Sequence, residues 1–173
     1  MRLFHISEED NISVFIPRLP KRKDLEQGTG LVWAITEDCL PNYLTPRNCP
    51  RVTYHCNERT TGKDINDFLS SETIKHVVAI EHIWFEAMRN TKLYLYEFDT
   101  TDFYLQDRGA GYFVSDKIQI PINKIVVDDL FKELIKRNVE VRIIDNLWDL
   151  SEKVIKTSFD WSMCRMDFAQ KKC

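Results

Sequence analysis

The residues best suited to chemistry are a histidine, a tryptophan and three arginines that lie near the first predicted strands: His5, Arg18, Trp33, Arg47 and Arg51. Guanidinium groups offer paired donors to a phosphate or a carboxylate, and an imidazole can hydrogen-bond a hydroxyl. His5 is expected in mid-strand on the more polar face, and the arginines lie in proline-bounded segments. Together they predict one anion-binding cleft in which His5 and Arg47 meet, with Trp33 close by.

A structural interpretation of the same residues stays open. His5 would then be a core histidine whose hydrogen bonds are satisfied within the fold. Arg47 and Arg51 would pair with acids such as Glu37 or Asp38.

The histidines and cysteines predict no metal site. His76 and His82 are six residues apart in a predicted strand, which separates them by ~20 Å. His55 and Cys56 are adjacent in a strand and point to opposite faces. The sequence contains no paired C-x-x-C motif and no helical H-x-x-x-H motif.

Nucleophilic and phosphate-binding motifs are also missing. There is no G-x-S-x-G motif, and Gly109–Gly111 lacks the third glycine and the lysine of the phosphate-binding loops. Arg47 and Arg51 flank Cys49 and would be able to activate its thiol. A buried structural thiol is nevertheless the favoured interpretation.

Alternating or short apolar runs that end in turn residues predict a sheet. The strands are expected near residues 3–7, 31–35, 51–55, 77–80, 93–98, 112–115 and 139–144. Helical spacing predicts helices within residues 61–69, 84–89, 128–138 and 146–158, and a short helix after Thr36 that Pro41 and Pro46 limit. The predicted fold is α+β, with a mixed or mainly antiparallel sheet core and helices towards the C-terminal end. One domain over residues 1–173 is expected.

Composition restricts the class of protein. The formal net charge is -3, from 24 Lys and Arg against 27 Asp and Glu, which argues against binding of duplex DNA through bulk charge. No run approaches the ~18 apolar residues of a membrane helix, and the N-terminal segment does not read as a secretory signal. Five cysteines without regular spacing fit free thiols in a reducing compartment, so we expect a cytoplasmic protein without disulfides. The oligomeric state stays open.

Several segments together resemble a family of small uncharacterised bacterial proteins. They are Leu3–Glu9, Phe15–Arg18, Val32–Ile35, Pro46–Val52, Tyr112–Ser115 and Val139–Ile143. The resemblance covers most of the chain and implies a bacterial, cytoplasmic protein. It implies no particular activity.

A more distant likeness is to the ADP-ribosyltransferase-like fold, which includes RNA 2′-phosphotransferases. Leu3-Phe4-His5 resembles the strand whose histidine contacts the NAD ribose, and Val32–Thr36 resembles the strand that carries an aromatic residue before a short helix. The stretch from Tyr112 to Pro121 resembles the strand that begins with the catalytic glutamate, but Gly111 or Tyr112 stands at the position of that acid. The acid that orients the ribose in ordinary ADP-ribosyl transfer is therefore missing at this position.

The RNA 2′-phosphotransferases use a histidine and arginines, for which this chain offers His5 with Arg18, Arg47 and Arg51. The expected function is therefore binding of a nucleotide or of another phosphate-bearing ligand. The cofactor stays open, and NAD is the one that the resemblance implies. Whether the protein is an enzyme also stays open; if it is, ADP-ribosyl or RNA 2′-phosphate transfer is the expected chemistry. The alternative is a non-enzymatic interaction or regulatory protein, whose aromatic residues are core and interface anchors.

Overall fold

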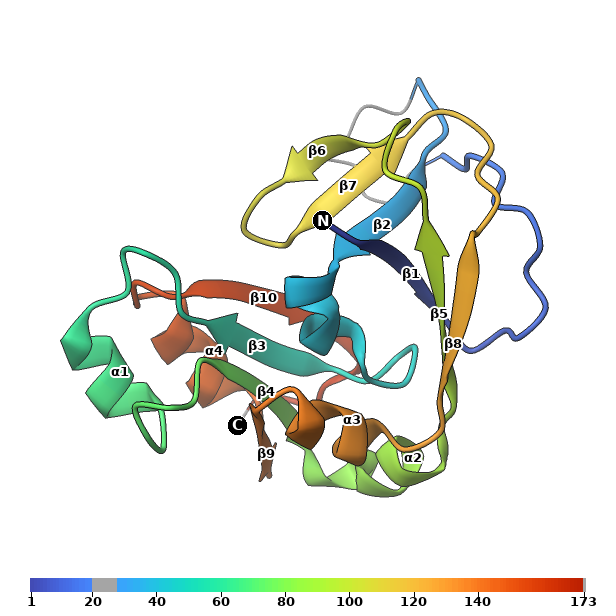
Figure 1. The fold of residues 1–173 in the computed structure, drawn as a ribbon. Helices are drawn as coiled ribbons and strands as arrows, with labels where there is room; N and C mark the ends of the chain where they lie inside the picture. The colour runs from blue at the N-terminus through green and yellow to red at the C-terminus, as the bar shows by residue number, and fades with distance from the viewer. Residues whose placement is uncertain (20–27, 173) are drawn as a thin grey trace. The chain divides into compact units, whose positions relative to one another are not determined.

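Two sheets organise the chain, each in a compact unit of its own (Figure 1). The computed structural model describes residues 1–19 and 28–172. The first unit comprises Met1–Leu40 and Leu93–Val127, and the second comprises Pro41–Lys92 and Asp128–Cys173. The α+β class is confirmed. The expectation that residues 1–173 form a single domain stays a prediction.

The first unit is built on a six-stranded antiparallel sheet with the order β6-β7-β2-β1-β5-β8. Its strands are β1 (Leu3–Ser7), β2 (Val32–Thr36), β5 (Leu93–Phe98), β6 (Tyr104–Asp107), β7 (Tyr112–Ser115) and β8 (Asn123–Val127). The N-terminal strand β1 therefore lies in the interior of the sheet, with β2 on one side and β5 on the other.

Alternate residues of the central strands build the core of this unit. Leu3, Val32, Ala34, Tyr96 and Phe98 form one buried cluster, and Phe15 packs against them from the segment that follows β1. Burying a large apolar side chain contributes roughly 1.5–3 kcal/mol, so this face holds the sheet to the segment around Phe15. That segment is also pinned by backbone hydrogen bonds in both directions between Phe15 and Gln119, at 2.8 and 2.9 Å.

The second unit is built on a four-stranded sheet with the order β10-β3-β4-β9. Its strands are β3 (Arg51–His55), β4 (His76–Glu81), β9 (Val139–Ile144) and β10 (Asp160–Cys164). Only the β4–β9 pair of this sheet is parallel.

All four of the described α-helices belong to the second unit. They are α1 (Gly62–Phe68), α2 (Phe85–Asn90), α3 (Leu130–Lys136) and α4 (Trp148–Val154). Val52, Tyr54, Val77 and Ala79 of the sheet pack with residues that include Leu69, Leu147, Val154 and Phe159. The threonine hydroxyl of Thr61 caps α1 and the carboxylate of Asp129 caps α3.

The sequence predicted most of these elements and missed three strands. Five of the predicted strands have the observed bounds, while β2 and β4 differ by one residue at their ends. The missed strands are β6, β8 and β10. All four residues of β6 are exposed, so its sequence lacks the alternation of apolar and polar residues that predicts a strand. The short helix after Thr36 is a 3-10 helix over Glu37–Tyr43, with Pro41 inside it.

We predict that Gly111→Ala destabilises the protein strongly. Gly111 has φ +67, and a Cβ built on it would lie 2.5 Å from Cys39 Sγ and 2.8 Å from Thr36 Oγ1. The left-handed backbone and the clash together are expected to lower the free energy of unfolding by about 2–4 kcal/mol, measured by urea unfolding. Gly62→Ala is the matched control, because nothing lies within 4 Å of its Cβ position. Equal stability of the two variants would contradict the prediction.

Candidate functional site

His5 is held by a hydrogen bond that its ring donates to the neighbouring strand β2. Its Nδ1 lies 2.9 Å from the carbonyl oxygen of Trp33 on β2, and its ring lies against Phe15 with centroids 4.8 Å apart. A carbonyl oxygen can only accept, so Nδ1 must carry the proton that is donated. The prediction that His5 occupies a polar face is wrong. The face shared by Leu3 and His5 carries the apolar cluster of the first unit, because Phe15 packs on it.

The surroundings of His5 favour its neutral form. Burial lowers the pKa of His5, the Trp33 bond opposes this, and the positive charge of Arg18 lowers the pKa further. A neutral ring with its proton on Nδ1 has a lone pair on Nε2. None of the described residues hydrogen-bonds to Nε2, so this atom can accept a hydrogen bond from a ligand.

Arg18 is brought to this site by its backbone. Its N–H and C=O pair with those of Leu31 at 3.2 and 2.9 Å, two residues before Trp33. The Arg18 side chain is exposed, and its charge acts on the His5 ring. Among residues 1–19 and 28–172, no carboxylate forms an ion pair with its guanidinium.

Trp33 reaches His5 through its main chain and not through its indole. Because Phe4 pairs with Ile35, His5 lies opposite Ala34, and the Trp33 side chain points to the other face of the sheet. There the indole packs edge-on against Tyr112, with ring centroids 5.2 Å apart. A ligand held at Nε2 of His5 therefore lies on the face of the sheet opposite to that indole.

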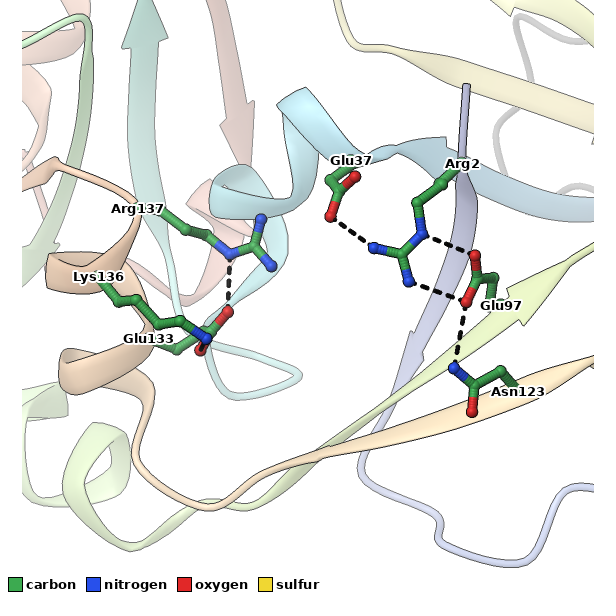
Figure 2. A network of polar contacts seen from close by, with 7 residues as sticks. All are labelled: Arg2, Glu37, Glu97, Asn123, Glu133, Lys136 and Arg137. Atoms are coloured by element: carbon green, nitrogen blue, oxygen red, sulfur yellow. Dashed lines mark hydrogen bonds and ion pairs between the residues drawn. The ribbon is translucent and has the colours of Figure 1, made fainter.

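A polar network fixes the start of β1, three residues before His5. Arg2 donates from Nε to Glu97 Oε1 at 2.7 Å and from Nη2 to Glu97 Oε2 at 2.9 Å, and from Nη1 to Glu37 at 2.9 Å (Figure 2). The Asn123 amide donates to the same Glu97 carboxylate at 3.3 Å. The Arg2 guanidinium, aided by Asn123, holds the pKa of Glu97 below its usual range. Figure 2 also draws the separate ion pair along α3 of the second unit, between Arg137 and Glu133.

Arg47 and Arg51 belong to the second unit. Arg51 is only 6% exposed and donates to two main-chain carbonyls, from Nε to Asn42 at 2.8 Å and from Nη1 to Cys49 at 3.1 Å. Its guanidinium also lies over the Tyr43 ring, 5.3 Å from the centroid. Arg51 thus holds the loop that carries Arg47, whose side chain is exposed. The predicted common cleft of His5 and Arg47 stays a prediction.

Cys49 does not have the environment of a reactive thiol. It is completely buried, and burial raises its pKa to about 12 even though Arg51 acts in the opposite direction. The thiol is therefore protonated at neutral pH, and the structural interpretation fits its surroundings.

The sequence did not identify a polar cluster on β3 and β4 of the second unit. The rings of His55 and His76 stack with centroids 4.9 Å apart, and His76 Nε2 lies 2.8 Å from Asn42 Oδ1. His55 Nε2 lies 4.0 Å from a carboxylate oxygen of Asp160. The alternation of Arg51, Thr53 and His55 on one strand face was the available signal. Register with β4 was needed to place His76 beside it.

Comparison with protein families shows which family the chain belongs to. The sequence model of a family of unknown function (DUF6886) matches residues 4–169. The chain belongs to this family. No match was found among curated proteins or among solved structures. The expectation of an uncharacterised family is thereby confirmed.

The part of the chain that the structure describes shows neither a metal-binding cluster nor a membrane-spanning helix. No group of three or more His, Cys, Asp or Glu residues within 1–19 and 28–172 is arranged to hold a metal ion. In the same ranges, no helix has the length and apolar character needed to cross a bilayer.

We predict that the buried His76 makes the protein acid-sensitive. Burial, reinforced by His55, lowers the pKa of His76 from 6.5 to about 3. Below pH 6.5 the unfolded chain takes up a proton that the folded chain refuses, so the free energy of unfolding falls with decreasing pH. The limiting slope is about 1.4 kcal/mol per pH unit, measured by urea unfolding between pH 7 and pH 4.

His76→Gln should flatten this slope, because a glutamine amide can still donate to Asn42 but does not titrate. His82→Gln is the control, since the side chain of His82 is 54% exposed. The prediction fails if His76→Gln retains the acid slope of the unmodified protein.

Proposed function

We propose that this protein binds a nucleotide or another phosphate-bearing ligand at His5 and Arg18 of the first unit. The observation that supports the proposal best is the state of the His5 ring. Its Nδ1 is occupied by the Trp33 carbonyl at 2.9 Å, which leaves Nε2 as an acceptor without a partner among the described residues. A half-buried acceptor of this kind suits a sugar hydroxyl, which can donate to it.

Arg18 supplies the complementary charge. An arginine fork matches the oxygens of a phosphate, and Arg18 has no ion-pair partner among the described residues. Its positive charge also lowers the pKa of His5, and this keeps Nε2 unprotonated and able to accept a hydrogen bond. A nucleotide carries both groups that this pair would recognise, a hydroxyl and a phosphate.

The resemblance to the ADP-ribosyltransferase-like fold extends the proposal to NAD as the ligand. Transfer of an ADP-ribosyl group or of an RNA 2′-phosphate would then be the reaction, with His5 contacting a ribose hydroxyl. Arg51 and the Trp33 indole have other partners, so we assign them to positioning the loop and packing the sheet.

A bacterial and cytoplasmic setting is part of the proposal. Cys49, Cys56 and Cys164 are free thiols, which suits a reducing compartment.

The test is calorimetric titration of the full chain with NAD, ADP-ribose, a 2′-phosphorylated oligonucleotide and inorganic phosphate. We expect binding of at least one nucleotide in the micromolar to millimolar range. Arg18→Ala should weaken it by about ten- to a hundredfold, because a charged hydrogen bond to phosphate contributes ~1.5–3 kcal/mol. Arg89→Ala is the control, since Arg89 is exposed and pairs with Glu86 in the second unit.

His5→Asn separates the ligand role of His5 from its structural role. The asparagine amide can replace Nδ1 as the donor to Trp33 but has no atom at Nε2. We expect a folded variant whose melting temperature is slightly lower, because the ring contact with Phe15 is lost, and about tenfold weaker binding. Binding of the unmodified protein should stay constant from pH 8 to pH 6.5, because the pKa of His5 is lowered. Absence of all binding at millimolar ligand, or unchanged affinity of both site variants, would refute the proposal.

A further inference from the structure

Two neighbouring segments of the first unit alternate like strands but expose aliphatic side chains. Phe15 and Gln119 pair with each other and are 8% and 7% exposed. The residues on either side point the opposite way, as alternation requires. They are Val14, Ile16, Ile118 and Ile120, and Ile122 continues the pattern. Their exposed fractions are 44%, 62%, 61%, 67% and 66%. We call these five residues the aliphatic strip.

The aliphatic strip is large for a surface that faces water. If each side chain exposes on the order of 100 Å², the strip offers roughly 500 Å², near the upper end of the ~300–600 Å² expected for the largest apolar patch of a monomer. Such patches mark sites of association. A shallow hollow borders the strip, so this surface is not flat. Its lining includes Asn11, Ser13, Pro121 and Ile122.

The charged residues around the strip indicate whether a membrane surface or a second copy of the chain would cover it. Lys117 pairs with Asp102, Asp116 lies next to it in the chain, and Lys124 donates to the main-chain carbonyl of Asp10. Acids and bases are thus intermixed at this rim. A membrane surface would favour an excess of basic residues. A rim of mixed sign is instead complementary to itself when a two-fold rotation brings it against a second copy.

We propose that the aliphatic strip is the interface of a symmetric homodimer. A standard interface buries ~800 Å² on each partner, with an apolar centre and a polar rim. The strip provides the centre, and the mixed charges around it provide the rim. β8, the edge strand of the six-stranded sheet, continues from the strip and carries Val126, which is 53% exposed.

The experiment measures the molar mass of the full chain by sedimentation equilibrium over a concentration series. The unmodified protein should approach twice the 20.5 kDa of one chain. Ile120→Lys should raise the dissociation constant of the dimer at least tenfold, because it places a charge in the apolar centre. Ile135→Lys is the matched control, since Ile135 is 69% exposed on α3 of the second unit, and it should leave the dimer intact.

The melting temperature of each variant shows whether it is folded. If Ile120→Lys does not fold, Ile120→Thr makes the same test with a residue that favours extended backbone. A monomer at the highest soluble concentration overturns the proposal, as does a dimer that Ile120→Lys leaves intact. Binding of a monomer to phosphatidylserine vesicles, abolished by Ile120→Lys, would assign the strip to a membrane surface instead and would equally overturn it.

Discussion

The arrangement of the first unit depends on how Arg2 fixes the start of β1. One guanidinium joins Glu97 of β5 to Glu37 of the 3-10 helix that follows β2, and Asn123 of β8 completes the network. Arg2 is partly exposed, with 43% of its side chain accessible, so its contribution is geometric more than energetic. Since a slip of one residue would turn every side chain of β1 to the other face, this network and the apolar alternation together decide which face His5 occupies.

The state of His5 follows from that register. With β1 fixed between β2 and β5, the Nδ1 atom meets the Trp33 carbonyl and the ring meets Phe15. Both contacts are made within the fold, and neither involves a hydrogen bond to Nε2. The second unit contains a histidine that is more deeply buried. There His76 is 8% exposed, its pKa is lowered to about 3, its ring stacks on His55, and its Nε2 is hydrogen-bonded to Asn42. This burial suits a structural role for His76, whereas His5 is only partly buried.

The sequence predicted the fold better than the site, for a physical reason. Alternation and apolar runs are local, so strands such as Val139–Ile144 were found with their observed bounds. Strands whose residues face solvent on both sides, such as Tyr104–Asp107, carry no such local signal. Contacts of a site are not local. The prediction chose His5 and Arg18, which both lie in the first unit, where the charge of Arg18 lowers the pKa of His5. It also chose Arg51, whose burial against the carbonyls of Asn42 and Cys49 depends on a loop conformation that its residue type does not reveal.

One short segment connects the two proposals in the first unit. Phe15 turns inward and packs on the ring of His5, while Val14 and Ile16 turn outward into the aliphatic strip. Any partner that covers the strip would restrict this segment, and through Phe15 it would restrict the His5 ring. If covering the strip changes the affinity of the His5 site for its ligand, the ligand must change the affinity of the dimer by the same factor, because such coupling is reciprocal.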